Sequence, residues 1–497
     1  MSGLRLNAAA LTALPPAVRR PRFERAALRC GIVHLGLGAF ARAHLAVFND
    51  DALDAGAMPQ WGLCGVSLRH ADTRDALAPQ AGLYTLALRD ADEGGAPRQQ
   101  LRIIGGLCET RAAPEDPAAV LLRIASAEAR IVSLTVTEKG YCHLPASGEL
   151  RLGDADIAHD LVHGQAPRSA IGFIVHGLAL RRRRGLGGLT LMSLDNLSAN
   201  GRVLRGLVLA FAEALGDPAL ADWIASRCSF PCSMVDRIVP RTTDVDRDGI
   251  AQALGVRDTW PVVAEPFIDW VLEDRFVAGR PDWPGVRLVA THDDVAAWER
   301  LKLRMVNGAH SALAYLGVVA GWATVDAALR QPDLRRFIDT LLRDEVEPSL
   351  AGVVVPARYR EGLLLRFANP ALAHRCAQIA MDGSQKIPQR VLGTVRDRLA
   401  VGAPIAQLAL ALAAWLHFLR GHDEAGRPYA IDDPLAAALQ ALHREAEALA
   451  DPHARAACLT RFAPVFGDLA GDERLVAALA GPLQSLRQRG VSATLAA

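Results

Sequence analysis

Residues 31–53 constrain the fold of this chain more than any other segment. They read GIVHLGLGAFARAHLAVFNDDAL, a short apolar run followed by a glycine-rich turn and an amphipathic stretch. Apolar runs bounded by glycine favour buried strands, and apolar residues at helical spacing favour a helix that covers a sheet. The segment therefore predicts a strand, a tight turn and a helix, which is the first unit of an α/β fold.

The turn in this segment has the spacing of a dinucleotide-binding fingerprint. It contains Gly36-x-Gly38-x-x-Ala41, with the helix expected to begin near Phe40. Gly36 permits the tight turn, Gly38 lets the backbone approach a pyrophosphate, and the small Ala41 lets the helix pack close to the strand. The pyrophosphate would then lie at the N-terminus of this helix. The pattern predicts a Rossmann-type domain that binds NAD or NADP.

The second strand leaves the choice of cofactor open. An NAD-selective site usually has an acidic residue at the end of this strand, to bind the ribose 2′-hydroxyl. Here the sequence GVSLRHAD places Ser67 and Arg69 at that end. Arg69 would either meet a 2′-phosphate or lie in solvent at the start of the next helix. We expect NAD, with NADP as the open alternative.

Further strands and helices alternate along the first half of the chain. WGLCGVSL (61–68), RIVSLTVTEKGY (130–141) and LTLMSLDNL (189–197) have the apolar and β-branched character of strands. Residues 169–185 have helical periodicity and end in four arginines, Arg181–Arg184, which we interpret as a solvated helix end that complements the helix dipole. A phosphate or polyanion site is the alternative for these arginines. The alternation predicts a doubly wound, largely parallel sheet.

The character of the sequence changes near residue 285. From there on, helical periodicity dominates and strand signals are few. We therefore predict an α/β plus all-α protein, with a Rossmann-type domain at residues 1–285 and a mostly helical domain at residues 286–497. The longest apolar run, residues 405–419, is short for a membrane span and is interrupted by polar residues, so it predicts a buried core helix.

Composition excludes several classes of partner. The 55 basic and 54 acidic side chains give a formal net charge of +1, which gives no reason to expect nucleic acid or an anionic membrane as a partner. The first residues lack the apolar segment of a secretory signal. The eight cysteines are scattered and none forms a C-x-x-C pair, so we expect buried free thiols, a reducing cytoplasmic location and no bound metal. A metal site at Cys228 and Cys232 is the alternative.

One predicted helix carries three polar residues among apolar ones. In LKLRMVNGAHSALAYLG (301–317), Lys302, Asn307 and His310 interrupt a run of leucine, methionine, valine and alanine. On an α-helix with Lys302 at the origin, His310 lies at about 80° and Asn307 at about 140°, so the three share one side. That side is either a solvated stripe or the wall of a polar pocket.

Seven motifs, in this order, resemble one known family. They are GLGAFARAH, SLTVTEKGY, SLDNLSANG, FPCSMVDRIVPRTT, EPFIDWVLEDRF, LKLRMVNGAHSALAYLG and MDGSQKIPQR, within residues 30–395. The chain resembles the mannitol dehydrogenase family of long-chain polyol dehydrogenases, which includes mannitol 2-dehydrogenase, arabinitol dehydrogenase and fructuronate reductase. The resemblance implies zinc-independent hydride transfer between NAD(P) and a polyol or keto sugar. It also implies a Rossmann domain followed by a helical domain, with the active site between them.

The resemblance assigns the proton-transfer chemistry to the polar helix. Oxidation of a secondary alcohol needs a base for the hydroxyl proton and donors for the developing oxyanion, and a lysine can serve as the base when burial lowers its pKa. By resemblance Lys302 is the general base, Asn307 and Asn196 hold the alcohol oxygen, and His310 positions a substrate hydroxyl. Glu299, one turn before Lys302, is a candidate proton relay. Its alternative role is an ordinary helix ion pair.

Substrate recognition is assigned by resemblance to three further residues. Asp236 in MVDR would accept hydrogen bonds from substrate hydroxyls, and Lys386 in DGSQK would bind the far end of the substrate. Some mannitol-specific members carry arginine where this chain has Gln378. The nearby Arg375 either substitutes for it or is simply a helix surface residue. This departure bears on the identity of the substrate.

The leading hypothesis is an NAD(P)-dependent polyol dehydrogenase that acts on a CH–OH group and interconverts a sugar alcohol, similar to mannitol or arabinitol, and its keto sugar. A fructuronate (hexuronate) reductase is the alternative within the family. A regulator that senses a nucleotide is the non-enzymatic alternative, although the Lys302, Asn307 and His310 set is intact. We expect a small-molecule polyol or keto-sugar substrate and a monomer or weak oligomer. The exact substrate and the physiological direction stay open.

Overall fold

The computed structural model describes residues 4–91, 96–144, 148–350, 352–353, 355 and 358–497. The chain divides into two compact units. The first is built mainly from the chain up to Asp90 and from Pro97–Ala296, and the second mainly from Ala297–Ala497. The first unit is α/β and the second is almost entirely helical, which confirms the predicted fold class.

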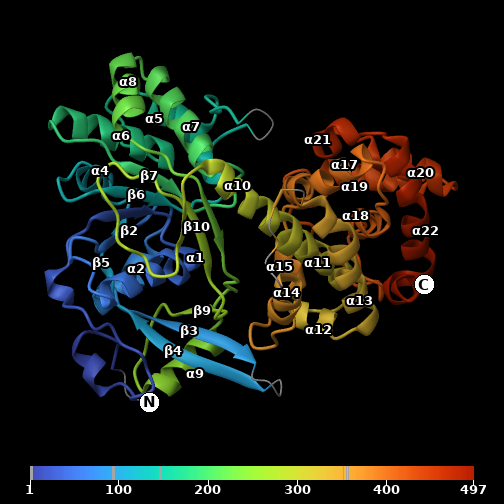
Figure 1. Cartoon of the computed structure of the whole chain (residues 1–497), viewed down its shortest axis with the longest axis horizontal. Coiled ribbons are helices and arrows are strands. Elements are labelled where there is room, and N and C mark those ends of the chain that lie inside the picture. The colour runs from blue at the N-terminus through green and yellow to red at the C-terminus, as the bar shows by residue number, and fades with distance from the viewer. Residues whose placement is uncertain (1–3, 92–95, 145–147, 351, 354, 356–357) are drawn as a thin grey trace. The chain divides into compact units, whose positions relative to one another are not determined.

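A five-stranded parallel sheet forms the centre of the first unit (Figure 1). Its strands, in spatial order, are β5 (Leu107–Ala112), β2 (Leu63–Ser67), β1 (Ile32–Leu35), β6 (Ile131–Leu134) and β7 (Thr190–Ser193). The chain thus builds outward from β1 on one side and then crosses to the other side, which is the strand order of a Rossmann fold. The order reverses beside β1, so the carboxyl end of β1 lies at the topological switch point.

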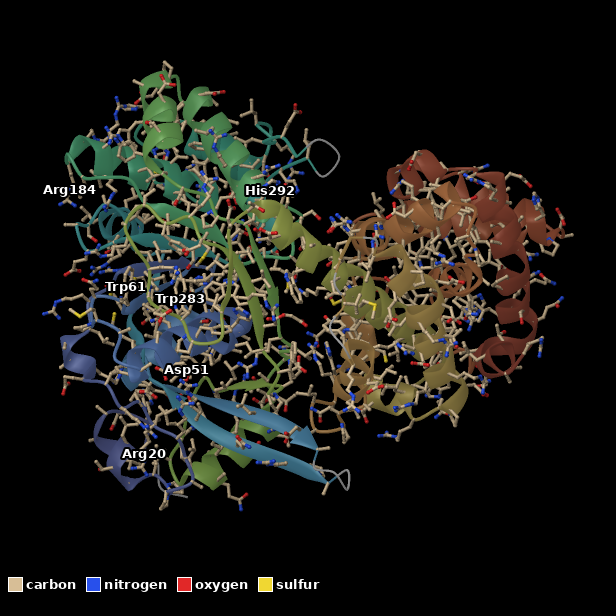
Figure 2. The ribbon with its side chains drawn as sticks, in the orientation of Figure 1. Arg20, Asp51, Trp61, Arg184, Trp283 and His292 are labelled. Carbon is tan, nitrogen blue, oxygen red and sulfur yellow. The ribbon has the colours of Figure 1, made fainter. Side chains whose placement is uncertain are left out.

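Both faces of this sheet are buried, because successive side chains of a strand point to opposite faces. On one face, Val33 and Leu35 of β1 belong to a core cluster that includes Phe173 of α6 (Ala170–Arg183). On the other face, Ile32 belongs to a second cluster with Trp61, Trp270 and Trp283. Figure 2 labels Trp61 and Trp283 within this unit. The remaining helices of the unit are α1 (Ala39–Ala43), α2 (Leu45–Asp54), α3 (Asp72–Leu77), α4 (Pro117–Ile124), α5 (Ala155–Asp160), α7 (Asn200–Ala214), α8 (Pro218–Arg227) and α9 (Asp244–Leu254).

Two smaller sheets complete the first unit and were not predicted from the sequence. One has the order β4 (Pro97–Ile104), β3 (Tyr84–Ala91), β9 (Val262–Ala264), and the other has the order β11 (Arg287–Val289), β10 (Asp269–Glu273), β8 (Ser233–Asp236). Ala87 of β3 and Ile103 of β4 share a core cluster with Ile250 and Leu254 of α9, and Figure 1 shows α9 beside these strands. Several of these strands have only three to five residues, too few for a clear period-two pattern.

The arginine run at the end of α6 is not uniformly solvated, so our interpretation is wrong for its first member. Arg181 is buried, and its guanidinium donates to the carbonyls of Ser126 (2.5 Å) and Gly187 (2.5 Å). Arg184, labelled in Figure 2, donates to the carbonyl of Ala125 (2.9 Å). These arginines tie α6 to the loop that follows α4, because that loop presents carbonyl groups that lack helical partners.

The second unit is a helical assembly in which α11 (Ala309–Ala320) packs against α18 (Ala406–Phe418), and α18 against α22 (Glu473–Leu495). Helix α18 lies within the apolar run at residues 405–419 and is buried along most of its length, as predicted. Within the described ranges, no helix has both the length and the apolar character that crossing a membrane would need. The other α-helices of this unit are α12 (Val325–Leu329), α13 (Pro332–Thr340), α14 (Tyr359–Phe367), α15 (Cys376–Ile379), α16 (Gly383–Ile387), α17 (Gly393–Ala400), α19 (Ala436–Glu447), α20 (Pro452–Thr460) and α21 (Ala463–Phe466).

The remaining helical segments are the α-helix α10, three π-helices and several short 3₁₀ segments. Helix α10 (His292–Leu301) runs into the π-helix η5 (Lys302–Gly308), and two further π-helices are η6 (Leu341–Val346) and η8 (Pro388–Leu392). The 3₁₀ segments are η1 (Ala9–Ala13), η2 (Arg25–Ala27), η3 (Ala78–Gln80), η4 (Glu138–Tyr141), η7 (Glu347–Ser349) and η9 (Gly467–Leu469).

Candidate active site

Lys302 and Asn307 lie on a π-helix, and not on the α-helix that the sequence predicts. In a π-helix the hydrogen bonds join residues five apart, so the turn is wider than in an α-helix. Lys302 and Asn307 are five apart, and η5 therefore stacks them along one side, where an α-helix would separate them by about 140°. The angles that we calculated for an α-helix are wrong for this segment. Single π-helical turns inside helices occur frequently at functional sites.

Burial decides between the two interpretations of these polar residues. Lys302 is 6% exposed and His310 is 8% exposed, while Asn307 is half-buried. A lysine or histidine in a solvated stripe would be largely exposed. A solvated stripe is therefore excluded for Lys302 and His310.

Close packing against η8 holds the wide turn in place. A Cβ atom at Gly308 would lie 2.9 Å from the carbonyl oxygen of Arg390, so only glycine lets the two π-helices approach to this distance. Arg304 of η5 donates to the carbonyl of Ser349 (2.9 Å) and pairs with Asp397 (2.5 Å). These contacts offset the poorer hydrogen-bond geometry of a π-helix and fix the positions of the residues on it.

His310 lies in a buried aromatic and cationic environment. Its ring stacks on Phe367 with the centroids 4.7 Å apart, and it meets the ring of His374 edge-on at 5.1 Å. Burial lowers the pKa of His310 well below its ordinary value, and the positive charges of Arg390, Arg366 and Lys386 lower it further. The imidazole is therefore neutral. Its Nε2 has no hydrogen-bond partner among the residues that the structure describes. A buried polar atom of this kind suits a substrate hydroxyl.

Three other predicted site residues, Glu299, Lys386 and Arg375, also belong to the second unit. Glu299 is half-buried in the last turn of α10, three residues before Lys302. Lys386 of α16 donates from Nζ to the carbonyls of Met381 (2.5 Å) and Ile379 (3.2 Å), and its charge contributes to the lowered pKa of His310. Arg375 is exposed at the start of α15.

In the first unit, the backbone turn after β1 requires glycine at position 36. Gly36 has φ of +91°, a conformation that side chains disfavour. A Cβ atom there would lie only 2.2 Å from the carbonyl oxygen of Thr135. The N–H of Gly36 donates to the carbonyl of Val66 (2.8 Å), so the turn also contacts the end of β2. These contacts show why the tight turn needs a glycine at position 36.

Gly38 differs from Gly36, because no atom in the described part of the chain lies close enough to require a glycine there. Its φ is negative, and the atom nearest to an added Cβ would be the carbonyl oxygen of Gly36, at 3.9 Å. The space in front of Gly38 is therefore available to a ligand.

The helix after the turn carries the other two fingerprint residues. Ala41 is buried in α1, and Phe40 stacks on His44 with the ring centroids 5.0 Å apart. The chain leaves helical geometry at His44, so the predicted single helix is two, α1 and α2.

A buried histidine that sequence analysis missed holds the glycine turn. His34 of β1 shares a hydrogen bond of 2.9 Å with Ser133 Oγ at Nδ1 and another of 2.9 Å with Thr135 Oγ1 at Nε2. The Thr135 hydroxyl donates to the carbonyl of Gly36 (2.8 Å). Burial lowers the pKa of His34 to about 4, so the ring is neutral and its two nitrogens supply one donor and one acceptor. The signal for His34 was its place as a polar residue inside an apolar strand.

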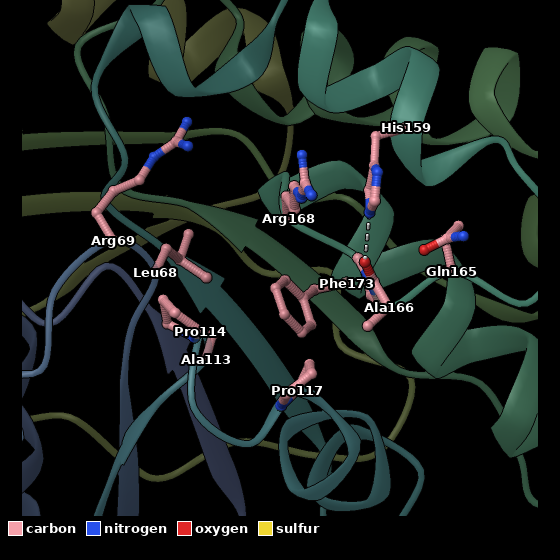
Figure 3. A pocket seen from close by; sticks show the side chains of 11 residues that line it. Leu68, Arg69, Ala113, Pro114, Pro117, His159, Gln165, Ala166, Arg168 and Phe173 are labelled. Carbon is pink, nitrogen blue, oxygen red and sulfur yellow. Dashed lines mark hydrogen bonds between the residues drawn. The ribbon is translucent and has the colours of Figure 1, made fainter.

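A cavity of about 400 Å³ lies where β2 and β5 end (Figure 3). Arg69 follows β2 at its rim, Arg168 and Phe173 line it from the start of α6, and His159 shares a hydrogen bond with the carbonyl of Ala166 (3.1 Å). The Arg69 side chain is 62% exposed and pairs with Asp156 at 2.8 Å. Both interpretations of Arg69 are compatible with this position, because the residue is solvated and also borders a cavity.

Asn196 and Asp236 both follow or end strands of the first unit. Asn196 is exposed just beyond β7, and Asp236 is buried as the last residue of β8.

Sequence analysis missed Asp195, whose carboxylate accepts from the N–H groups of Val136 (2.9 Å) and Thr137 (3.0 Å). Burial raises the pKa of Asp195 to about 6. This carboxylate also explains why the strand predicted to reach residue 141 ends at Leu134, because it captures the N–H groups that would continue the sheet.

Comparison with known proteins identifies relatives along the whole chain. Residues 30–285 match the family described as Mannitol dehydrogenase Rossmann domain, and residues 294–487 match the Mannitol dehydrogenase C-terminal domain. The chain is 39% identical over 499 residues to the mannitol 2-dehydrogenase of Pyrenophora tritici-repentis. The matched region covers 99% of this chain and 86% of that protein. It is 42% identical over 490 residues to the D-mannonate oxidoreductase of Escherichia coli. Here the matched region covers 97% of this chain and 98% of that protein. Its structure is similar to that of Pseudomonas fluorescens mannitol 2-dehydrogenase in ternary complex with NAD and D-mannitol, with a TM-score of 0.89, 37% identity and 99% of both chains covered.

The buried His34 predicts a pH dependence of stability. Its pKa is about 4 in the folded protein, whereas an exposed histidine titrates near 6.5. Between these values the unfolded chain binds a proton that the folded chain does not, so the free energy of unfolding falls as the pH falls. From about pH 7 to about pH 5, we expect His34 to contribute a loss of about 2 kcal/mol.

Urea unfolding of the wild type and of His34→Gln at both pH values measures this contribution. The wild type should lose more stability than the variant by about that amount. A His163→Gln variant is the matched control, because His163 is exposed and should leave the pH dependence unchanged. Equal losses in the wild type and in His34→Gln would contradict the assignment.

Proposed function

This chain belongs to the mannitol dehydrogenase family, and on that basis we propose that it is an NAD-dependent oxidoreductase that interconverts a sugar alcohol and its keto sugar, with Lys302 as the general base. The observation that carries the proposal is the π-helix η5, which carries the buried Lys302 and, five residues on, Asn307, shortly before the neutral His310. A buried amine, an amide and a neutral imidazole supply a base and donors without a metal ligand set.

The residues of the first unit fit a bound dinucleotide. We place the pyrophosphate against the backbone from Gly36 to Ala39, because the open space at Gly38 lets a ligand approach. We place the adenosine end beside the cavity at Arg69, where Arg69 and Arg168 would also suit a 2′-phosphate. When bound, NAD supplies the acceptor for the hydride that leaves the substrate carbon.

In this proposal the chain's own residues move the proton and hold the oxygen. Lys302 removes the hydroxyl proton during oxidation and returns it during reduction. The amide groups of Asn307 and Asn196 donate to the oxygen as it gains negative charge, and each such donor contributes about 3 kcal/mol to a typical oxyanion site. His310 positions a substrate hydroxyl through its buried Nε2. Glu299 relays the proton between Lys302 and solvent.

Three residues recognise the rest of the substrate in this proposal. Asp236 accepts hydrogen bonds from substrate hydroxyls through its carboxyl oxygens. Lys386 binds the far end of the chain of hydroxyls, and Arg375 assists it where mannitol-specific members use an arginine in place of Gln378.

A sugar acid is the second candidate substrate, and the charges around His310 favour it. Arg366, Arg390 and Lys386 all lie near enough to lower the pKa of His310 by their positive charge. A cationic, buried environment attracts a carboxylate more strongly than a neutral hydroxymethyl group. The similarity to D-mannonate oxidoreductase supports the same candidate.

The two glycines of the fingerprint should separate folding from cofactor binding. We expect Gly38→Ala to fold with a free energy of unfolding within about 1 kcal/mol of the wild type, because an alanine there meets no protein atom closer than 3.9 Å. It should weaken NAD binding at least about tenfold, because the methyl group takes the space of the pyrophosphate. Isothermal titration with NAD and urea unfolding measure the two effects. Gly36→Ala is the contrasting variant, since it should lose stability, and unchanged NAD affinity in Gly38→Ala would exclude this placement.

Replacement of Lys302 tests the base. We expect Lys302→Met to lower kcat about 10²- to 10⁴-fold, because the methionine fills the same buried space but cannot accept a proton. The measurement is the absorbance of NADH with D-mannitol, D-arabinitol or D-sorbitol as substrate, together with NAD affinity by titration. Retained NAD affinity shows that the first unit is folded, and an unchanged urea unfolding curve shows the same for the second. If kcat in Lys302→Met stays within about threefold of the wild type, Lys302 is not the base.

The charge of Lys386 tests the two substrate candidates. Lys386→Gln should lower kcat/KM for D-mannonate about tenfold and for D-mannitol less than about threefold, because only the acid carries a charge for the lysine to attract. Lys386→Arg is the matched control, since it keeps the charge. Equal effects on both substrates would remove Lys386 from carboxylate recognition. A wild-type kcat/KM that is higher for D-mannonate than for every polyol would replace the leading candidate with the second.

A further inference from the structure

Three cysteines from neighbouring strands converge at the edge of the parallel sheet opposite the glycine turn. Cys30 lies just before β1, while Cys64 and Cys108 are the second residues of β2 and β5. All three therefore lie where their strands begin, whereas Gly36 follows the end of β1. The sulfur atoms of Cys30 and Cys108 are only 2.9 Å apart.

An irregularity in the sheet brings Cys108 to this position. Leu63 pairs with Leu107, but the next residue, Cys64, pairs with Glu109, so Cys108 is an extra residue in β5. Such a bulge redirects a side chain that would otherwise follow the regular alternation of the strand. A Cβ atom at Gly62 would lie 2.9 Å from the Cys108 sulfur, so the glycine leaves room for it.

The positive charge of Arg123 and the neighbouring thiols favour the reactive form of Cys30. The Cys30 sulfur lies 3.4 Å from Glu109 Oε2, and the same carboxylate oxygen pairs with Arg123 at 2.6 Å. The hydrogen bond with Cys108, the Cys64 thiol and the charge of Arg123 lower the pKa of Cys30, although burial opposes them. The hydrogen bond with Cys30 raises the pKa of Cys108. The thiolate is the nucleophilic form of cysteine. Cys108 is only partly buried, which gives a small oxidant access to the pair.

We propose that Cys30 and Cys108 form a redox modification site, in which a peroxide converts the two thiols to a reversible disulfide. The Cys30 thiolate attacks one peroxide oxygen, the O–O bond breaks, and the departing hydroxide takes a proton to become water. The sulfenic acid on Cys30 then receives the sulfur of Cys108, the S–O bond breaks, and hydroxide leaves with the Cys108 proton as a second water. The two cysteines lose two electrons in total, and hydrogen peroxide is reduced to two molecules of water.

Four other thiols of the chain have a raised pKa, unlike Cys30. Cys142, Cys376 and Cys458 are buried, and burial raises the pKa of each. Cys228 is partly buried in the same way as Cys108, and burial raises its pKa to about 11. Exposure similar to that of Cys108, without a thiolate-favouring partner, makes Cys228 the matched control.

Peptide mass spectrometry of the full-length protein tests the proposal. The protein is treated with hydrogen peroxide, the remaining thiols are blocked with N-ethylmaleimide under denaturing conditions, and the digest is examined with and without dithiothreitol. We expect a peptide pair linked through Cys30 and Cys108 that disappears on reduction. Recovery of both cysteines as N-ethylmaleimide adducts, a Cys30–Cys64 linkage, or a linkage found only between two chains would overturn the proposal.

Single substitutions sharpen the result. In Cys108→Ser, the sulfenic acid on Cys30 should persist and react with dimedone, because the resolving thiol is gone. In Cys64→Ser and in the control Cys228→Ser, the Cys30–Cys108 linkage should form at the wild-type yield. Failure of Cys108→Ser to show a dimedone adduct on Cys30 would contradict the order of the two steps. The wild-type measurement decides the pairing even where a variant does not fold.

Discussion

The first unit depends on one steric constraint, which is the absence of space for a side chain at Gly36. The Thr135 carbonyl lies where a Cβ atom would be, so β1 and the loop after β6 approach more closely than any other residue would allow. His34, Ser133 and Thr135 link the same two strands through buried hydrogen bonds. Asp195, which follows β7, joins this layer through the N–H groups of Val136 and Thr137. The carboxyl ends of three strands are thereby held together at the switch point of the sheet, where ligands bind in folds of this type.

In the second unit, the comparable constraint is the approach of two π-helices. Gly308 of η5 meets the backbone of Arg390 in η8, and this contact fixes a wide turn that an isolated helix would not adopt. The wide turn brings Lys302 and Asn307 into line, and burial removes the solvent that would otherwise surround the amine. The neutral charge state of His310 follows from the same burial together with the cations around it. Backbone geometry and electrostatics therefore act on the same few residues.

The two edges of the parallel sheet have different chemistry. The edge with the carboxyl ends of the strands carries the glycine turn, the cavity at Arg69 and the Asp195 carboxylate. The edge where the strands begin carries the three neighbouring thiols. A parallel sheet separates the two because all of its strands point the same way. Residues at the N-terminal ends of the strands therefore lie on the opposite side of the sheet from residues at their C-terminal ends.

Sequence by itself determined the fold class, the position of the glycine turn and the family, because these depend on local patterns. Apolar periodicity predicted β1, β2, β7 and α6 to within a few residues, and the motif spacing around Lys302 and His310 indicated the family. Only the tertiary structure decided the rest. The short strands of the two small sheets depend on partners far along the chain, and the π-helix exists because η8 packs against it. The burial of Arg181, the hydrogen bonds of His34 and the contact between Cys30 and Cys108 each join segments that lie far apart along the chain. No local pattern records such distances, since they arise only when the elements pack.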